Sequence, residues 1–317
     1  MKIVILEPLA VSKDEILKAA EPILALGHEI IIAEEKLETV EEQIAFAKDA
    51  DILLIANSPL QPELVEALDQ LKLISVAFTG IDHLPLELCK ERKITVCNAQ
   101  GYATDATAEL TLALILAALR SLEAYAEAAK AGAARPNLKA NTLRGKTVGI
   151  VGTGAIGLRL AELVKAFDCK LIAYSRSEKE EAKALGIKYL PLEELLKEAD
   201  IVSLHLPLTE ASEGLISEAE LDLMKESAIL VNCARGALVD NAALARALNA
   251  GKIAAAAVDV LESEPPFPKD HPLLKAEHLT ITPHVAFLTE ESMLDRVQIV
   301  MKNIEAWLAG EPINVKL

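Results

Sequence analysis

The sequence predicts an α/β protein that contains two doubly wound parallel sheets. Short runs of aliphatic and β-branched residues alternate with segments of helical period, which indicates strands joined by crossover helices. The runs are apolar at nearly every position, as expected for strands covered by helices on both faces of a sheet. One long Ala/Leu/Glu pattern over 103–131 interrupts the alternation, which then restarts, so the 317 residues divide into two domains.

The first series of elements precedes the long helical pattern. Its predicted strands cover 2–6, 29–33, 51–55, 73–78 and 94–97. Its predicted helices lie near 12–25, 38–48, 61–69 and 84–91. Each pair of consecutive strands is therefore joined by a helix, which is the connection that parallel strands require.

The second series follows the long helical pattern. Its predicted strands lie within 146–152, 170–174, 200–206, 228–232, 254–260 and 279–282. A final helix is predicted over about 289–309, after the last strand.

Composition excludes several classes of protein. The chain has 32 Lys and Arg against 48 Asp and Glu, a net charge of −16, and 52% hydrophobic residues. That hydrophobic content excludes a disordered acidic tail. The negative charge argues against nucleic acid or an anionic membrane as the main partner, because both need a positive face.

The cysteines and the apolar segments indicate a soluble protein of the cytoplasm. Cys89, Cys97, Cys169 and Cys233 lie far apart, and no Cys-x-x-Cys is present, so we expect neither disulfides nor a metal site. The N-terminal residues MKIVILEP do not form a signal peptide. The apolar stretch 110–119 is too short to span a bilayer.

A glycine-rich turn gives the strongest local signal. It has the form G-x-G-x-x-G, follows a predicted strand at 147–151 and opens a predicted helix at about 155–166. In that context the glycines permit a tight turn, close approach of a pyrophosphate and close packing of helix on strand. We therefore predict cofactor contacts at Gly152, Thr153, Gly154, Ala155, Ile156 and Gly157.

The end of the next strand predicts which dinucleotide is bound. An NAD site usually has an acidic residue there, but this chain has Ser175, Arg176 and Ser177. Because a guanidinium group pairs with a phosphate, the segment favours NADP(H) over NAD(H). The alternative is an ordinary surface arginine in a turn.

Three more segments place charged groups just after predicted strands, where open α/β sheets bind ligands. Arg235 follows the strand at 228–232, and His284 follows the strand at 279–282. Asp259 ends a strand, and Glu264 lies in the loop that follows it. Each has an ordinary structural explanation as well: an arginine at a helix entry, a solvated loop glutamate and a hydrogen-bonded surface histidine.

Taken together, these motifs resemble the D-isomer-specific 2-hydroxyacid dehydrogenase family. The resemblance covers nearly the whole chain and is carried by the segments 79–114, 145–157, 205–209, 232–240, 258–265 and 282–286. It implies two Rossmann-like domains with the active site in the cleft between them. We assign 1–98 and 289–317 to a substrate-binding domain, and 99–288 to a dinucleotide-binding domain.

The resemblance also implies catalytic roles. Arg235 would hold the carboxylate and carbonyl oxygen of a 2-oxo acid, a bidentate role that suits arginine. His284 would exchange a proton with the substrate oxygen, and Glu264 would orient its imidazole. Backbone amides at Thr79 and Gly80 would anchor the carboxylate. No metal ion is required.

Further cofactor contacts follow from the same resemblance. Asp259 would face the nicotinamide carboxamide. The remaining positions implied as cofactor contacts are Thr104, Leu206, Pro207 and Cys233. The resemblance and the apolar helix around 104–130 also suggest a homodimer.

The expected function is hydride transfer between NADPH, or NADH, and a small 2-oxo acid. Glyoxylate and hydroxypyruvate are the first candidate substrates, so the chain would be a glyoxylate or hydroxypyruvate reductase. Alternatives within the family are D-lactate dehydrogenase and phosphoglycerate dehydrogenase. An alternative of a different class is a nucleotide-sensing, corepressor-like binding protein.

Overall fold

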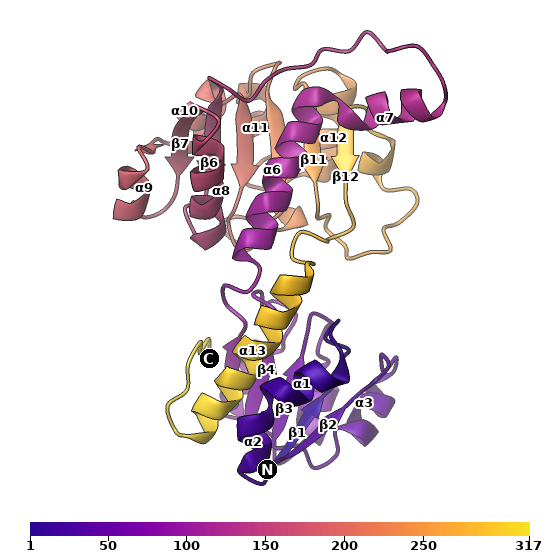
Figure 1. The fold of residues 1–317 in the computed structure, drawn as a ribbon, viewed down its shortest axis with the longest axis vertical. Coiled ribbons are helices and arrows are strands. Elements are labelled where there is room, and N and C mark those ends of the chain that lie inside the picture. Colours follow the sequence, from indigo (N-terminus) through magenta and orange to yellow (C-terminus); the bar gives the residue numbers. More distant parts are fainter. The chain divides into compact units, whose positions relative to one another are not determined.

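Two separate parallel sheets contain all the strands of the chain, and this confirms the predicted fold class. The computed structural model describes residues 1–317. It divides into one unit formed by Met1–Ala103 with Leu288–Leu317 and a second formed by Thr104–Phe287 (Figure 1). The first boundary lies beyond the predicted residue 98 because the chain stays bound to the first unit there: Ala99 N donates to Phe78 O at 3.0 Å.

The first unit is built on a sheet of five strands in the order β2-β1-β3-β4-β5. The strands are β1 (Lys2–Ile5), β2 (Glu29–Ile32), β3 (Ile52–Ile55), β4 (Leu73–Val76) and β5 (Thr95–Asn98). All neighbours pair in parallel. Every residue of β3 and β4 is buried, so the central strands form the core of this unit.

The helices of the first unit connect consecutive strands. They are α1 (Lys13–Ala19), α2 (Glu21–Ala25), α3 (Val40–Phe46), α4 (Pro62–Ala67) and α5 (Leu86–Glu91). The prediction of one helix over 12–25 is wrong, because α1 ends at Ala19 and α2 begins at Glu21, with Pro22 in its first turn. Proline has no N–H to continue a helical hydrogen-bond ladder.

The C-terminal helix α13 (Glu290–Leu308) completes the first unit. It packs against α1, α2, β4 and β5, and Figure 1 shows it beside α1. The tail that follows returns to the sheet edge, where Lys316 N donates to Val96 O at 2.8 Å. Asn303, which is fully buried in α13, donates from Nδ2 to Asn98 O at 2.9 Å and accepts from Asn314 Nδ2 at 2.8 Å.

The second unit has a sheet of seven strands in the order β12-β11-β10-β9-β6-β7-β8. The strands are β6 (Thr147–Val151), β7 (Lys170–Tyr174), β8 (Lys188–Tyr189), β9 (Ile201–Leu204), β10 (Ile229–Asn232), β11 (Ala255–Val258) and β12 (Leu279–Ile281). Connections run outward in both directions from β6, so the strand order reverses between β6 and β9. Ligands bind at such a switch point, outside the carboxyl ends of the strands.

Helices cover both faces of the second sheet. They are α6 (Thr104–Arg120), α7 (Leu122–Lys130), α8 (Ala155–Lys165), α9 (Glu180–Ala184), α10 (Leu192–Glu198), α11 (Glu218–Leu223) and α12 (Asn241–Asn249), with short 3₁₀ turns at Gly236–Leu238 and Pro272–Lys275. The expectation of one apolar helix around 104–130 is wrong, because this segment forms the two helices α6 and α7. Ser121 adopts a left-handed conformation, with φ of 46°, and this separates α6 from α7.

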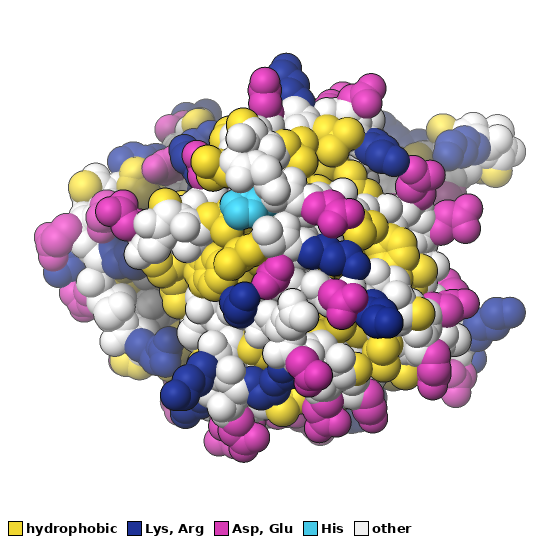
Figure 2. Space-filling model, turned by 90° about the horizontal axis from the view of Figure 1, so that it is seen from below, with side chains coloured by type: hydrophobic (Ala, Val, Ile, Leu, Met, Phe, Trp, Pro, Cys, Tyr) yellow, Lys and Arg dark blue, Asp and Glu magenta, His cyan; other side chains and the backbone are white.

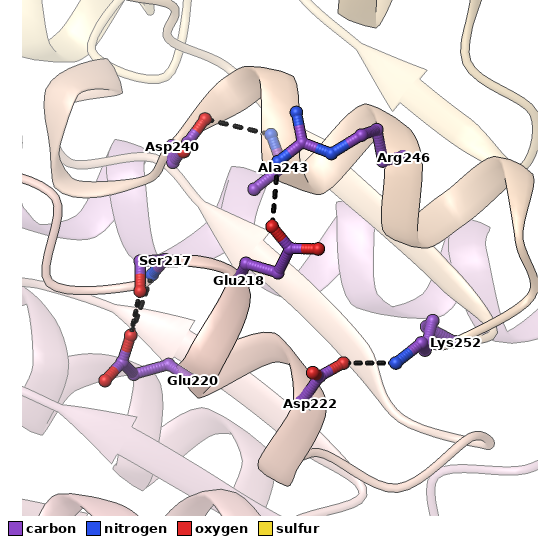
Figure 3. Close-up of polar contacts among 8 residues, drawn as sticks. All are labelled: Ser217, Glu218, Glu220, Asp222, Asp240, Ala243, Arg246 and Lys252. Atoms are coloured by element: carbon purple, nitrogen blue, oxygen red, sulfur yellow. Dashed lines mark hydrogen bonds and ion pairs between the residues drawn. The ribbon is translucent and has the colours of Figure 1, made fainter.

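The surface of α11 and α12 is held by capping interactions and exposed ion pairs (Figure 3). The Asp240 carboxylate accepts from Ala243 N at 2.9 Å, and the Ser217 hydroxyl pairs with the Glu220 carboxylate. Arg246 bonds to Glu218 at 3.1 Å, and Lys252 bonds to Asp222. Exposed ion pairs add little to the free energy of unfolding because water and salt screen them.

Charges of both signs lie on the face of the protein that Figure 2 draws. The face in Figure 2 shows acidic and basic side chains interspersed among hydrophobic ones. None of the helices combines the length and hydropathy that a membrane-spanning segment needs.

We predict that Asn303→Ala destabilises the first unit. The change leaves Asn98 O and the Asn314 amide without their buried partner, which costs about 1–3 kcal/mol. The urea concentration at the midpoint of unfolding, followed by circular dichroism, should fall. The exposed neighbour Lys302 provides the control, Lys302→Ala. Equal midpoints for both variants would contradict the anchoring role of Asn303.

Candidate active site

The glycine-rich turn joins β6 to α8 and leaves no room for larger residues. Gly152 has a φ of 105°, and a Cβ there would lie 2.6 Å from His205 O. A Cβ at Gly157 would lie 2.1 Å from Gly152 O. Both glycines are therefore required by the packing of strand, turn and helix.

The opposite side of the turn is open. A Cβ built at Gly154 meets nothing within 4 Å. Gly154 is the N-cap of α8, no side chain caps the helix, and no acidic residue lies in its first turn. Backbone N–H groups with positive dipole character thus face open space, which is the arrangement that binds phosphate. The turn therefore fits the pyrophosphate of a dinucleotide.

The segment Ser175–Ser177 follows β7, the neighbour of β6 in the sheet. Arg176 is exposed there. The first carboxylate after it, Glu178, is bound to Lys183 at 3.0 Å. The structure thus places an arginine at the end of the strand beside the turn, where the sequence predicted it.

A tyrosine that the sequence did not single out connects these two segments. The Tyr189 hydroxyl, on β8, donates to Thr153 Oγ1 at 3.0 Å and accepts from Lys179 N at 3.1 Å. Thr153 is only 1% exposed. No pattern predicted this contact, because β8 is only two residues long and its position follows from the folded sheet.

The remaining predicted cofactor contacts lie at three places in the second unit: the start of α6, the end of β9 and the end of β10. Thr104 begins α6, and Leu206 and Pro207 follow β9.

The backbone of His205 lies against Gly152, and its ring bonds through Nε2 to Ser203 Oγ at 2.9 Å. Burial lowers the pKa of His205 to about 4. Its ring is therefore neutral near pH 7.

Cys233 directly follows β10. Burial raises the pKa of its thiol to about 12. Since the thiolate is the nucleophilic form of cysteine, burial disfavours a nucleophilic role for Cys233.

The Glu264 and His284 side chains form a direct pair. Glu264 Oε2 lies 2.7 Å from His284 Nδ1. A carboxylate at this position holds the proton on Nδ1, so that Nε2 is the atom available for proton exchange. The Phe287 ring packs nearly perpendicular to the imidazole, with 5.5 Å between ring centroids. The two contacts fix the orientation of the imidazole.

A fully buried carboxylate holds the turn that carries His284. Asp259 accepts from Thr282 Oγ1 at 2.5 Å, from Val285 N at 2.9 Å and from Ala286 N at 2.7 Å. Its backbone oxygen accepts from His284 N at 2.8 Å. The sequence predicted that Asp259 lies near the cofactor but did not indicate this anchoring role. The role depends on side-chain bonds between residues 23 to 27 positions apart.

Arg235 follows β10 and leads into the 3₁₀ turn Gly236–Leu238. Its backbone oxygen accepts from Asn232 Nδ2 at 2.9 Å, and its guanidinium donates to Ala234 O at 2.8 Å. A Cβ at Gly236 would lie 1.9 Å from the carbonyl carbon of Leu261. The segment with Arg235 therefore packs directly against the start of the loop that carries Glu264.

Thr79 and Gly80 lie in the first unit, beyond the carboxyl end of β4. Asn98 Nδ2 donates to Thr79 O at 2.6 Å, so the backbone here is held by a buried side chain. The chain has no group of three or more His, Cys, Asp or Glu side chains that is placed to hold a metal ion.

Comparison with known proteins supplies the family. The family model described as D-isomer specific 2-hydroxyacid dehydrogenase, NAD binding domain, matches residues 112–286. A glyoxylate reductase of Aeropyrum pernix is 41% identical over 281 residues, covering 86% of this chain and 84% of that protein.

Two further matches broaden the comparison. A D-3-phosphoglycerate dehydrogenase of Archaeoglobus fulgidus is 38% identical over 264 residues, which are 83% of this chain but 50% of that protein. The solved structure of an acyclic imino acid reductase in complex with NADPH and D-Arg is 28% identical, with a TM-score of 0.89 and full coverage of both chains. The chain belongs to the D-isomer specific 2-hydroxyacid dehydrogenase family, as its motifs predicted, and is an NAD(P)-dependent oxidoreductase.

Proposed function

We propose that the protein reduces glyoxylate or hydroxypyruvate to the corresponding 2-hydroxy acid, with NADPH preferred over NADH. The 2.7 Å pair of Glu264 and His284 carries this proposal, because it supplies a proton donor oriented by a carboxylate. The relative from Aeropyrum pernix is a glyoxylate reductase, and this similarity supports the choice of substrate.

The chemistry of the reduction assigns a role to each side chain. Bound NADPH would supply a hydride to the carbonyl carbon. Arg235 would bind the substrate carboxylate and polarise the carbonyl oxygen through its two parallel N–H groups. His284 would deliver the proton from Nε2 to that oxygen, and in the reverse direction would remove it. Glu264 would stabilise the imidazolium form before the proton is transferred.

The two units take different parts in this proposal. The second unit would bind the dinucleotide through the turn at Gly152–Gly157, with additional contacts from Thr104, Leu206, Pro207, Cys233 and Asp259. The first unit would bind substrate through the backbone amides of Thr79 and Gly80. Backbone amides suit a carboxylate because they donate hydrogen bonds without adding a mobile charge.

The preference for NADPH rests on the end of β7. Ser175, Arg176 and Ser177 offer one guanidinium and two hydroxyls to a 2′-phosphate, and the nearby Glu178 is bound to Lys183. The imino acid reductase with the same fold was solved with NADPH, which is consistent with this preference.

Phosphoglycerate dehydrogenase is the second candidate function. The relative from Archaeoglobus fulgidus carries that name, but this chain spans about half of its length. We favour the smaller substrates because the Aeropyrum pernix glyoxylate reductase matches along most of both chains.

We further propose a homodimer in the cytoplasm. The helix α7 buries none of its residues, and Leu122 at its start is 59% exposed, which favours a contact with a second copy. The four cysteines are free thiols, which suits a reducing compartment.

The first prediction from the proposed function concerns the proton donor. His284→Ala should lower kcat for glyoxylate reduction by at least about 100-fold, because no other group would protonate the carbonyl oxygen. Steady-state kinetics give kcat, and fluorescence titration should show an unchanged Kd for NADPH. A variant with near-normal kcat would exclude His284 as the donor.

The second prediction concerns Arg235. Arg235→Lys keeps the charge but loses the bidentate geometry, so it should lower kcat/KM by about tenfold or more. Both KM for glyoxylate and kcat should change, because the contact exists in the bound substrate and in the transition state. Unaltered kcat/KM would remove Arg235 from the proposed site.

The third prediction concerns the dinucleotide. The wild-type protein should have a higher kcat/KM for NADPH than for NADH, and Arg176→Ala should lower the value for NADPH alone by about tenfold. Arg246→Ala is the matched control, since Arg246 is an exposed arginine on α12 that pairs with Glu218 on α11. Equal or reversed values for the two dinucleotides in the wild type would refute the preference.

A further inference from the structure

We propose that Tyr189 is a positioning residue that sets dinucleotide discrimination by fastening the loop 175–178 to the phosphate-binding turn. The inference rests on the proposed function, in that it takes this loop as the site that senses the 2′ position. It assigns a role to a side chain that lies outside every motif of the chain.

The loop is fastened to the turn at both of its ends. Before the loop, Tyr174 O accepts from Gly152 N at 2.8 Å. After the loop, Lys179 N donates to the Tyr189 hydroxyl, which itself donates to Thr153 Oγ1. The first fastening is part of the backbone, whereas the second depends on a single phenol group.

The Tyr189 ring is itself held in place. Tyr189 pairs with Ala173 in the parallel register of β7 and β8, and its ring packs against the core of the second unit. The hydroxyl therefore reaches the turn from a fixed base. Because Thr153 is only 1% exposed, water can replace the lost hydrogen bond poorly at that end.

Tyr189 connects the two parts of a dinucleotide that the protein must recognise separately. The turn would bind the pyrophosphate, and Arg176 would bind the 2′-phosphate. The Arg176 guanidinium can increase the affinity for NADPH over NADH only if the loop has a defined position relative to the turn. Without the Tyr189 hydroxyl, the loop would become ordered only when the dinucleotide binds, and the entropy cost of this ordering would weaken binding.

The test is Tyr189→Phe, measured first without dinucleotide. The bonds after Arg176 and Lys179 are trypsin sites in or beside the loop, and their cleavage rate should rise about tenfold as the loop opens more often. Tyr125→Phe is the matched control, because the Tyr125 hydroxyl donates to Leu138 O at 3.2 Å elsewhere in the same unit. Its cleavage at these sites should match the wild type.

Fluorescence titration then gives Kd for both dinucleotides. Tyr189→Phe should raise Kd for NADPH about tenfold and Kd for NADH about threefold or less, since only NADPH uses the 2′ contact. Thr153→Val, which removes the hydroxyl that receives the bond, should change the ratio of the two constants in the same direction.

The outcomes separate this inference from the proposed function. The wild-type ratio of the two Kd values tests the NADPH preference, whereas the change of that ratio in Tyr189→Phe tests the role of Tyr189. Cleavage rates and both Kd values within twofold of wild type would overturn the role of Tyr189. An equal rise in both constants, with the ratio unchanged, would also overturn it.

Discussion

The proposed chemistry depends on one buried carboxylate. Asp259 is fully buried, and a buried charge is tolerated only where hydrogen bonds replace the lost water. The donors that replace it, Thr282, Val285 and Ala286, all belong to the turn that carries His284. His284 has a φ of 55°, a conformation that needs support from its surroundings. The same hydrogen bonds therefore stabilise the buried Asp259 carboxylate in the folded second unit and hold the turn that orients His284.

The sheet order explains why the other groups lie nearby. Arg235, Asp259 and His284 follow β10, β11 and β12, which are consecutive neighbours, so their carboxyl ends share one edge of the sheet. The loop with Glu264 is held at both ends, since Leu261 packs against Gly236 and Glu262 bonds to His271 at 2.9 Å. Because Gly236 has no Cβ, its backbone can lie against the backbone of Leu261. This contact brings the segment with Arg235 to the loop that carries Glu264.

Local pattern predicted the strands, the glycine turn and the charged residues after the strands, because these features depend on neighbours in the sequence. It did not predict β8, the left-handed Ser121 or the bonds of Tyr189 and Asp259. A two-residue strand has no periodicity, and one left-handed serine within an apolar helical pattern leaves no compositional signal. Side-chain bonds across tens of residues arise only after the strands are in register, so a single sequence does not display them.

The net charge of −16 is reconciled with anionic ligands by the local arrangement of donors. The helices α1, α3 and α11 each begin with a Ser or Thr capping box and acidic residues in the first turn, which satisfy their N–H groups. The helix α8 has neither, so its N–H groups keep their positive character at the glycine turn. The proposed dinucleotide site therefore needs one helix that lacks both a side-chain cap and an acidic first turn, and Arg176 after the neighbouring strand β7. Arg235, which follows β10 of the same sheet, would add the local positive charge for the substrate carboxylate. An acidic surface elsewhere does not oppose this, because exposed charges beyond about 10 Å are screened by salt.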